Sequence, residues 1–226
     1  MRNVRPDALV FDLDGTLWDA AAASAEGWNH ALEELGMPAR VSVDEIRSVS
    51  GTPFEGCVAI LLSKLGPPSD RLLRSLEAHE RAVLEETGGA LYPGVAEGLQ
   101  LLAEVHPLYV VSNCPDWYLK AFLRSSGLRD RFTGWDCHGA SGLPKAVMLQ
   151  NLMRRCVLQA AVYLGDTQGD QEAAAAAGMT FVHARYGFGD LGEDCDPTVR
   201  GHTGGSQVPA VDSFTEFAGL FLADTE

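Results

Sequence analysis

The sequence predicts an α/β protein: a parallel sheet with helices on both faces, and a helical module inserted after the first strand. Short apolar runs that suit strands buried on both faces occur at 8–11, 108–113 and 160–166. Helical patterns alternate with the later runs, which indicates a parallel sheet. Between about residues 19 and 88 only helical patterns occur, which is typical of a bundle-like module.

The length and composition are typical of a globular protein. Of its 226 residues, 46% are hydrophobic, enough for the core of one sizeable domain or of a domain with an insertion. The net charge of −14 argues against nucleic acid and anionic membranes as partners, because both bind Lys and Arg. The five cysteines are scattered without a Cys-x-x-Cys pair, and no signal region or bilayer-length apolar stretch occurs, so we expect a cytoplasmic protein.

The first strand ends in two carboxylates, Asp12 and Asp14. Side chains two residues apart on a strand share a face, so these two should project together, roughly 7 Å apart, where ligands of open α/β sheets bind. Nearly buried carboxylates repel each other, and a hard divalent cation such as Mg²⁺ relieves that repulsion. An Asp-Gly pair is also a common turn, so this stretch by itself leaves a solvated turn open.

The inserted stretch is predicted to hold four helices. Apolar residues at helical spacing over 28–35 stop at Gly36, a C-terminal signal. Ser42, followed by acidic residues, begins a second helix, and Pro53 begins a third. The apolar stripe over 72–84 forms the fourth.

The remaining elements alternate as strands and helices. We expect further strands at 132–137 and 180–184, and helices at 95–102, 118–123, 146–155 and 171–177. The stretch from 187 to 207 is rich in Gly and Asp and is predicted to be a loop. A closing helix over 212–222 would be capped by Asp212 or Ser213.

Polar residues follow three of the strands, and the carboxyl ends of parallel strands meet at one edge. They are Asp12 and Asp14, then Ser112 and Asn113, then Asp166 and Asp170, with Lys145 just ahead of a helix. Each has an ordinary explanation as a strand end, a surface lysine, a turn acid or a helix cap. Their joint occurrence favours one site.

That set of residues suits phosphoryl transfer, which needs an in-line nucleophile, a cation and donors for the remaining charge. Asp12 can act as nucleophile and Asp14 as the acid and base for the alkoxide and water. Asp166 can complete the metal's ligands, with Asp170 as a further ligand or beside it. Phosphate can be bound by the Ser112 hydroxyl, by nearby backbone N–H groups such as that of Asn113, and by Lys145.

In these motifs the chain resembles the haloacid dehalogenase superfamily of hydrolases. The matching residues are Asp12-Leu13-Asp14-Gly15-Thr16, Ser112, Lys145 and Gly165-Asp166-x-x-x-Asp170. The resemblance covers essentially the whole chain. The stretches 111–114, 165–170 and 186–189 look most like the phosphoglycolate phosphatase-like branch.

The resemblance implies a Rossmann-like core formed by residues 1–17 and 90–226, with a helical cap domain at 18–89. It also implies Mg²⁺ bound by Asp12, the backbone carbonyl of Asp14, and Asp166, and a phosphoaspartyl intermediate at Asp12. We count Asp170 with the metal site as well.

Departures from the family's other activities narrow the expectation. Dehalogenases of the superfamily lack the second aspartate, which is Asp14 here, and mutase-like members carry a histidine where this chain has Ser24. We therefore expect an Mg²⁺-dependent phosphatase of small phosphomonoesters, phosphoglycolate-like or other phosphorylated metabolites. The alternatives are a phosphomutase of the same superfamily and a non-catalytic binding protein on the same fold.

Substrate selection is expected in the cap. The turn over 48–53 resembles the loop that related caps lower over the site, so Gly51 and Thr52 are candidate specificity residues. Arg47, next to that turn, is a third candidate, because a guanidinium suits a carboxylate or a second phosphate. The plainer interpretation of Arg47 is a helix-end arginine.

Overall fold

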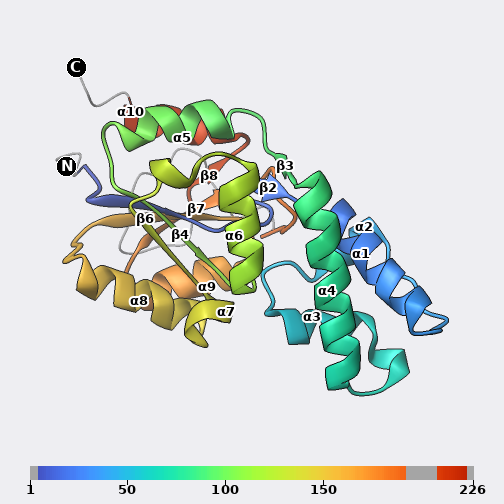
Figure 1. Cartoon of the computed structure of the whole chain (residues 1–226). Coiled ribbons are helices and arrows are strands. Elements are labelled where there is room, and N and C mark those ends of the chain that lie inside the picture. The colour runs from blue at the N-terminus through green and yellow to red at the C-terminus, as the bar shows by residue number, and fades with distance from the viewer. Residues whose placement is uncertain (1–4, 192–207, 223–226) are drawn as a thin grey trace.

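Six parallel strands form the central sheet of the protein (Figure 1). The computed structural model describes residues 5–191 and 208–222. The strand order is β5 (Gly134–Cys137), β4 (Leu108–Ser112), β1 (Ala8–Phe11), β6 (Ala161–Gly165), β7 (Thr180–Ala184) and β8 (Ala210–Val211). The predicted parallel α/β sheet is confirmed.

Strand β1 lies at the point where the chain changes direction across the sheet. From β1 the chain passes to β4 and β5 on one side, and then crosses to β6 on the other. Every residue of β1, β4 and β6 is buried, as their apolar sequences require. The crevice of an open α/β sheet lies at such a switch point, so the carboxyl end of β1 is the natural place for a ligand.

Helices cover both faces of this sheet. The helices α5 (Val95–Ala103), α6 (Asp116–Ser125) and α10 (Phe214–Leu222) contribute to one apolar cluster with Leu9 and Phe11 of β1. The helices α8 (Lys145–Arg155) and α9 (Gln168–Ala177) contribute to a second cluster with Ala8 and Val10. Alternate side chains of β1 therefore enter opposite cores, as the period of a strand dictates (Figure 1).

Four helices follow β1 and lie together beside the sheet (Figure 1). They are α1 (Ala21–Glu34), α2 (Val43–Ser48), α3 (Phe54–Leu61) and α4 (Asp70–Thr87), and they share an apolar cluster of their own. Gly27 allows α1 to pack closely on α4, because a Cβ there would collide with the backbone of Glu80. This separate core supports the predicted cap at 18–89, which stays a prediction.

A short antiparallel pair joins the helical module to the sheet. Strand β2 (Trp18–Asp19) leads out of the sheet region and β3 (Ala90–Leu91) leads back. Two-residue strands are too short to leave a pattern, so the sequence does not predict β2, β3 or β8. For the same reason it does not indicate α7 (His138–Ser141) or the 3₁₀ turns at Ser63–Leu65 and Arg129–Arg131.

Capping side chains begin some of the helices. Ser42 and Glu45 form a capping box on α2, and the Ser213 hydroxyl accepts the backbone N–H of Glu216. Helices α6 and α9 begin at 116 and 168, earlier than predicted; in α9 the added residues at 168–170 carry no apolar pattern. Of the predicted loop at 187–207, residues 192–207 lie outside the described residues. Among the described helices, none is both long and apolar enough to span a bilayer.

Candidate active site

Three carboxylates meet at the carboxyl end of β1. Asp12 follows β1, Asp166 follows β6, and Asp170 lies in the first turn of α9; all three side chains are buried. One carboxylate oxygen from each lies within 4.8 Å of the others. The backbone N–H of Asp12 donates to the carbonyl of Leu164, which fixes the Asp12 backbone against β6. The predicted convergence of strand ends thus exists for these acids.

Lys145 provides the positive charge within this cluster. Its Nζ lies 2.9 Å from Oδ1 of Asp12 and 2.5 Å from Oδ1 of Asp170. Burial alone would lower the pKa of Lys145, but the two carboxylates outweigh burial and raise it, so the ammonium stays charged. Burial likewise opposes ionisation of Asp170, yet Lys145 and hydrogen bonds from Thr167 lower the pKa of that carboxyl.

The cluster holds more negative charge than Lys145 neutralises. Burial, reinforced by the charge of Asp170, raises the pKa of Asp12 to about 6 and that of Asp166 to about 8. Oδ2 of Asp166 accepts the backbone N–H groups of Phe188, at 2.8 Å, and Gly189, at 3.2 Å. Its Oδ1 is buried and has no hydrogen-bond partner among the described residues. An orphaned carboxylate oxygen beside two further carboxylates fits a divalent cation.

Glycines surround Asp166 because no larger residue has room. Gly15 has φ +75°, and a Cβ there would collide with Oδ2 of Asp166. A Cβ on Gly187 would collide with the carbonyl of Gly15, and one on Gly189 with the carbonyl of Asp166. The glycine of the Asp-Gly-Thr sequence therefore serves both the backbone conformation and the space around the acid.

Replacement of Gly15 by alanine should destabilise the protein by about 3 kcal/mol, the sum of left-handed strain and overpacking against Asp166. Gly142→Ala is the matched control, because Gly142 has φ +67° but nothing within 4 Å of the position that a Cβ would occupy. That control should lose about 1 kcal/mol, from strain alone. Urea unfolding of both variants measures the difference, and equal losses would contradict the crowding at Asp166.

Asp14 lies outside the carboxylate cluster. Strand β1 ends at Phe11, so the alternation of a strand does not extend to Asp14, and the expected common face of Asp12 and Asp14 is not formed by a strand. Oδ1 of Asp14 accepts hydrogen bonds from the Tyr118 hydroxyl, at 2.5 Å, and from Nε1 of Trp18, at 3.2 Å. Burial raises the pKa of Asp14 to about 7. Its carboxylate faces a pocket instead of the three acids.

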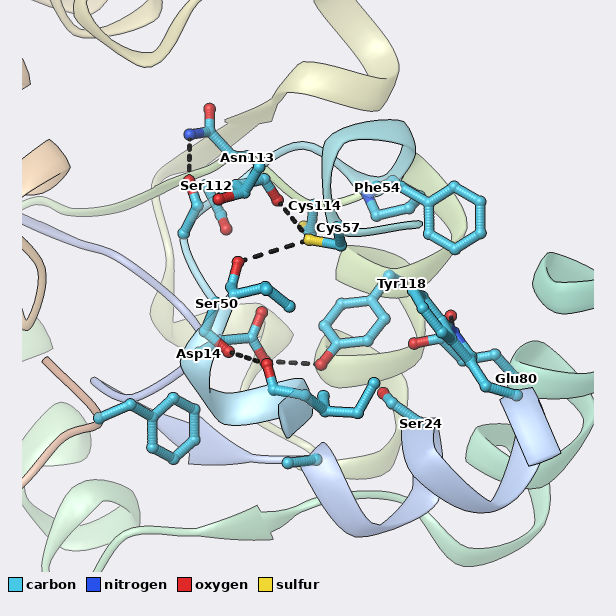
Figure 2. A pocket seen from close by; sticks show the side chains of 18 residues that line it. Asp14, Ser24, Ser50, Phe54, Cys57, Glu80, Ser112, Asn113, Cys114 and Tyr118 are labelled. Atoms are coloured by element: carbon cyan, nitrogen blue, oxygen red, sulfur yellow. Dashed lines mark hydrogen bonds between the residues drawn. The ribbon is translucent and has the colours of Figure 1, made fainter. Parts of the chain in front are cut away.

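This pocket lies between the helical module and the sheet edge (Figure 2). It has a cavity volume of about 80 Å³ and is partly open to solvent. The sheet side contributes Asp14, Ser112, Asn113, Cys114, Pro115, Tyr118 and Phe188. The helical module contributes Ala21, Ser24, Trp28, Ile46, Val49, Ser50, Gly51, Thr52, Phe54, Cys57 and Glu80. The helical module and the sheet edge therefore form this pocket together.

The predicted phosphate-binding residues of β4 reach this pocket in different ways. Ser112, the last residue of β4, is buried and lines the pocket. Nδ2 of Asn113 donates to the carbonyl of Gly51 at 2.7 Å, so this amide ties the sheet to the turn after α2 (Figure 2). Gly51 has φ +85°, and a Cβ there would press on Thr167. The turn that contains Gly51 therefore lies against Asn113 and Thr167, next to the carboxylate cluster.

The three predicted specificity residues differ in whether they line the pocket. Gly51 and Thr52 line the pocket, whereas Arg47 does not. The Arg47 guanidinium pairs with Asp19 at 2.7 Å and with Asp44 at 3.1 Å, and it lies over the ring of Phe188, 5.7 Å from the centroid. Arg47 therefore joins α2 to β2 and to the loop after β7.

Sequence reasoning missed several pocket residues. Tyr118 gave no signal, because an aromatic residue near the start of a helix looks like packing. Glu80 did leave a signal: it occupies the position between Leu76 and Leu84 in the apolar stripe of α4, where a solvated acid would not stand. The structure places Glu80 in the pocket lining with only 5% of its surface exposed.

Comparison with known proteins agrees with this geometry. The family model "Haloacid dehalogenase-like hydrolase" matches residues 9–184. A phosphoglycolate phosphatase of Rhodobacter capsulatus is 34% identical over 188 residues, covering 80% of this chain and 85% of the relative. Among solved structures, a predicted phosphoglycolate phosphatase from Haemophilus somnus superposes with a TM-score of 0.74 at 21% identity, covering 96% of this chain and 99% of that one. CbbY from Rhodobacter sphaeroides, in complex with phosphate, gives 0.76 at 20% identity, covering 94% and 96%. At such identities these two structures support the fold.

Proposed function

Because this chain belongs to the haloacid dehalogenase-like hydrolase family and is a phosphoric monoester hydrolase, we propose that it cleaves small phosphomonoesters through an aspartyl-phosphate intermediate at Asp12. The observation that carries the proposal is the buried cluster of Asp12, Lys145, Asp166 and Asp170 beside a pocket that Asp14 lines. In this proposal Asp12 attacks the phosphorus, and Asp14 exchanges protons with the alcohol.

Asp12 is the nucleophile in this proposal. Burial raises the pKa of Asp12, and the adjacent Lys145 ammonium opposes that rise and favours the carboxylate. The same ammonium lies 2.9 Å from Oδ1, which restricts the rotation of the side chain. A carboxylate that is ionised, desolvated and oriented is a competent nucleophile toward phosphorus.

Asp12 and Asp166 would supply carboxylate ligands for Mg²⁺, with Asp170 beside them and the backbone carbonyl of Asp14 as an additional ligand from the family pattern. When bound, the ion would offset the charge of these carboxylates and of the phosphoryl oxygens. The orphaned Oδ1 of Asp166 supports this assignment. Asp170 already accepts hydrogen bonds from Lys145 and Thr167, so its part is to hold Lys145 and to add charge beside the ligands.

The reaction needs two proton transfers, and Asp14 serves both. As a carboxylate oxygen of Asp12 bonds to phosphorus, the bond from phosphorus to the alcohol oxygen breaks, and Asp14 gives its proton to that oxygen. Water then attacks the phosphorus of the aspartyl phosphate, Asp14 takes the proton of the water, and Asp12 leaves with phosphate released. The pKa of about 7 places Asp14 between its two forms near neutral pH.

Tyr118 and Trp18 orient Asp14 for these transfers. Both donate to the same oxygen, Oδ1, which leaves Oδ2 free to carry the exchanged proton toward the pocket. Ser112 at the end of β4 is the hydroxyl donor to the phosphoryl group, with Lys145 as its cationic counterpart. Asn113 takes part by holding the turn at Gly51 over the phosphate end of the pocket.

A hydrolysis panel tests the function. Purified protein is incubated with p-nitrophenyl phosphate and with several small phosphorylated metabolites, with Mg²⁺ or with EDTA, and free phosphate is measured. We expect phosphate release that requires the metal. Absence of release from every phosphoester in the presence of Mg²⁺ would contradict the proposal.

Mg²⁺ should stabilise the protein more at pH 8 than at pH 5.5. In the metal-free fold the raised pKa values of Asp12 and Asp166 mean that the folded state holds protons that the unfolded state has lost; this contribution to stability is full below about pH 4 and disappears as the pH rises through about 6 and 8. Metal binds the ionised carboxylates. Metal binding therefore restores the stability that is lost when these carboxyl groups lose their protons at high pH. At about a hundredfold excess over Kd the gain is about 2.7 kcal/mol, or about 5–10 °C in Tm.

Thermal melts with Mg²⁺ and with EDTA at both pH values measure this effect. Asp166→Asn should lose most of the Mg²⁺ shift, while Asp130→Asn, at an exposed aspartate, should keep it. A shift that is larger at pH 5.5 than at pH 8 would argue against binding by these carboxylates.

A further inference from the structure

In the proposed function, the pocket lined by Asp14 receives the alcohol part of the substrate. As far as the structure describes the chain, this pocket contains acidic side chains and no positively charged one. Among the described residues that line it, Asp14 and Glu80 are acidic, and there is no Lys, Arg or His. Arg47, the cationic residue predicted for specificity, is held by Asp19 and Asp44 and is not in the lining. The other lining side chains are uncharged: most are apolar or carry a hydroxyl, and Asn113 adds an amide. An anionic group on the alcohol part would therefore find no partner of opposite charge here.

Glu80 is an unusual residue for such a wall. It lies in the middle of α4, on the face that packs on α1, and is 5% exposed. Its Oε2 accepts the indole N–H of Trp28 at 2.8 Å, and Ser24 also hydrogen-bonds to it. In the described part of the chain, no Lys, Arg or His nitrogen comes within the 4.0 Å of an ion pair with Glu80. A buried carboxylate without a cation is costly, which favours a functional reason for its presence.

Glu80 retains hydrogen-bonding capacity toward the pocket. Burial raises the pKa of the Glu80 carboxyl, and the hydrogen bonds with Ser24 and Trp28 oppose that rise by favouring the ionised form. An ionised carboxylate offers about four lone-pair sites, and Trp28 and Ser24 use only part of them. Figure 2 shows Glu80 and Ser24 at the Tyr118 end of the pocket, away from Ser112 and Asn113. Glu80 and Asp14 also repel each other electrostatically. Burial raises the pKa of Asp14, and the negative charge of Glu80 raises it further.

We propose that Glu80 determines substrate choice by accepting a hydrogen bond from a hydroxyl or ammonium group on the alcohol part, and that this pocket disfavours phosphomonoesters whose alcohol part is anionic. The inference rests on the proposed phosphatase function and narrows it. A second negative charge would be desolvated between Asp14 and Glu80, whereas a donor would complete the hydrogen bonding of a buried acid. The relatives named phosphoglycolate phosphatase would then differ from this enzyme in substrate, since phosphoglycolate carries a carboxylate.

A series of three two-carbon phosphomonoesters tests the proposal on the unaltered enzyme. Phosphoglycolate, 2-hydroxyethyl phosphate and phosphoethanolamine have nearly the same size, and their alcohol parts end in a carboxylate, a hydroxyl and an ammonium group. We expect kcat/KM for phosphoglycolate to be at least tenfold below that of the better of the other two. A preference for the ammonium ester identifies a charged partner, and similar values for both donors identify hydrogen bonding.

The outcomes separate the inference from the function beneath it. Cleavage of p-nitrophenyl phosphate together with a preference for phosphoglycolate would overturn the inference alone. No cleavage of any ester, p-nitrophenyl phosphate included, would overturn the phosphatase function and the inference with it.

Glu80→Gln then tests the residue itself. The amide has the same size and can still accept from Trp28, but it lacks the charge. We expect the ratio of kcat/KM for phosphoethanolamine to that for phosphoglycolate to fall about tenfold in this variant. Glu86→Gln, at an exposed acid of the same helix, should leave the ratio unchanged. A general folding defect would lower both rates together, so an unchanged ratio in Glu80→Gln would overturn the role of Glu80.

Discussion

Replacement of Asp12 by asparagine is expected to lower phosphate release by about 10,000-fold or more, because the amide removes the nucleophile on which both chemical steps depend. The change preserves the size of a fully buried side chain. It also removes one of three crowded carboxylates, and Lys145 keeps its partner Asp170 at 2.5 Å. The fold should therefore survive, with a Tm close to that of the unaltered protein at neutral pH.

Two measurements make this result specific to the nucleophile. Steady-state phosphate release gives the size of the loss, and acid quenching of the unaltered enzyme with labelled substrate should trap a phosphoenzyme that the Asp12→Asn variant does not form. Asp130→Asn controls for the loss of an acid elsewhere. Trapping of a phosphoenzyme in Asp12→Asn at an undiminished level would remove Asp12 from this role.

Asp14→Asn is expected to show the second-largest effect, about a 100- to 10,000-fold loss with alkyl phosphates, as for removal of a general acid–base catalyst. The loss in kcat/KM should be smaller for p-nitrophenyl phosphate, because p-nitrophenolate leaves without needing a proton from Asp14. Release of phosphate from the aspartyl intermediate still needs a base, so this substrate should give an initial burst of p-nitrophenolate followed by slow turnover.

Stopped-flow absorbance with p-nitrophenyl phosphate, and steady-state rates with an alkyl phosphate, provide the comparison. If Asp14→Asn lowered kcat/KM equally for both leaving groups and gave no burst, Asp14 would be acting through structure or metal affinity and not by proton transfer. The hydrogen bonds from Tyr118 and Trp18 to an asparagine oxygen remain possible, so its side chain should keep its place.

The sheet and the acid cluster could be predicted because each depends on a local pattern. The strands β1, β4 and β6 are apolar on both faces, and parallel strands bring the residues after them to one edge. Asp12 and Asp166 therefore followed from their positions in the chain, whereas Lys145, at the start of α8, entered the prediction only as part of the joint set. The phosphatase class followed from the resemblance that these motifs carry, which the family match confirms.

The arrangement of the pocket could not be predicted in this way. The position of Asp14 depends on a turn at Gly15 and on donors from Trp18 and Tyr118, which lie far apart in the sequence. The sequence predicts that Asn113 faces phosphate, but its amide meets a carbonyl of the helical module through a contact that only the packed structure contains. Glu80 stands on a helix in which charged residues are frequent, and its burial is a result of how closely Gly27 lets α1 approach.

The glycine ring around Asp166 sets the limits within which this enzyme can be redesigned. Gly15, Gly187 and Gly189 come from opposite ends of the chain, and none leaves room for a methyl group. Side chains there cannot be varied to tune the metal end. The walls of the neighbouring pocket come largely from residues 21–80, in a helical bundle with its own apolar core. Substitutions intended to change specificity should therefore be made in that bundle, and the three glycines around Asp166 should be kept.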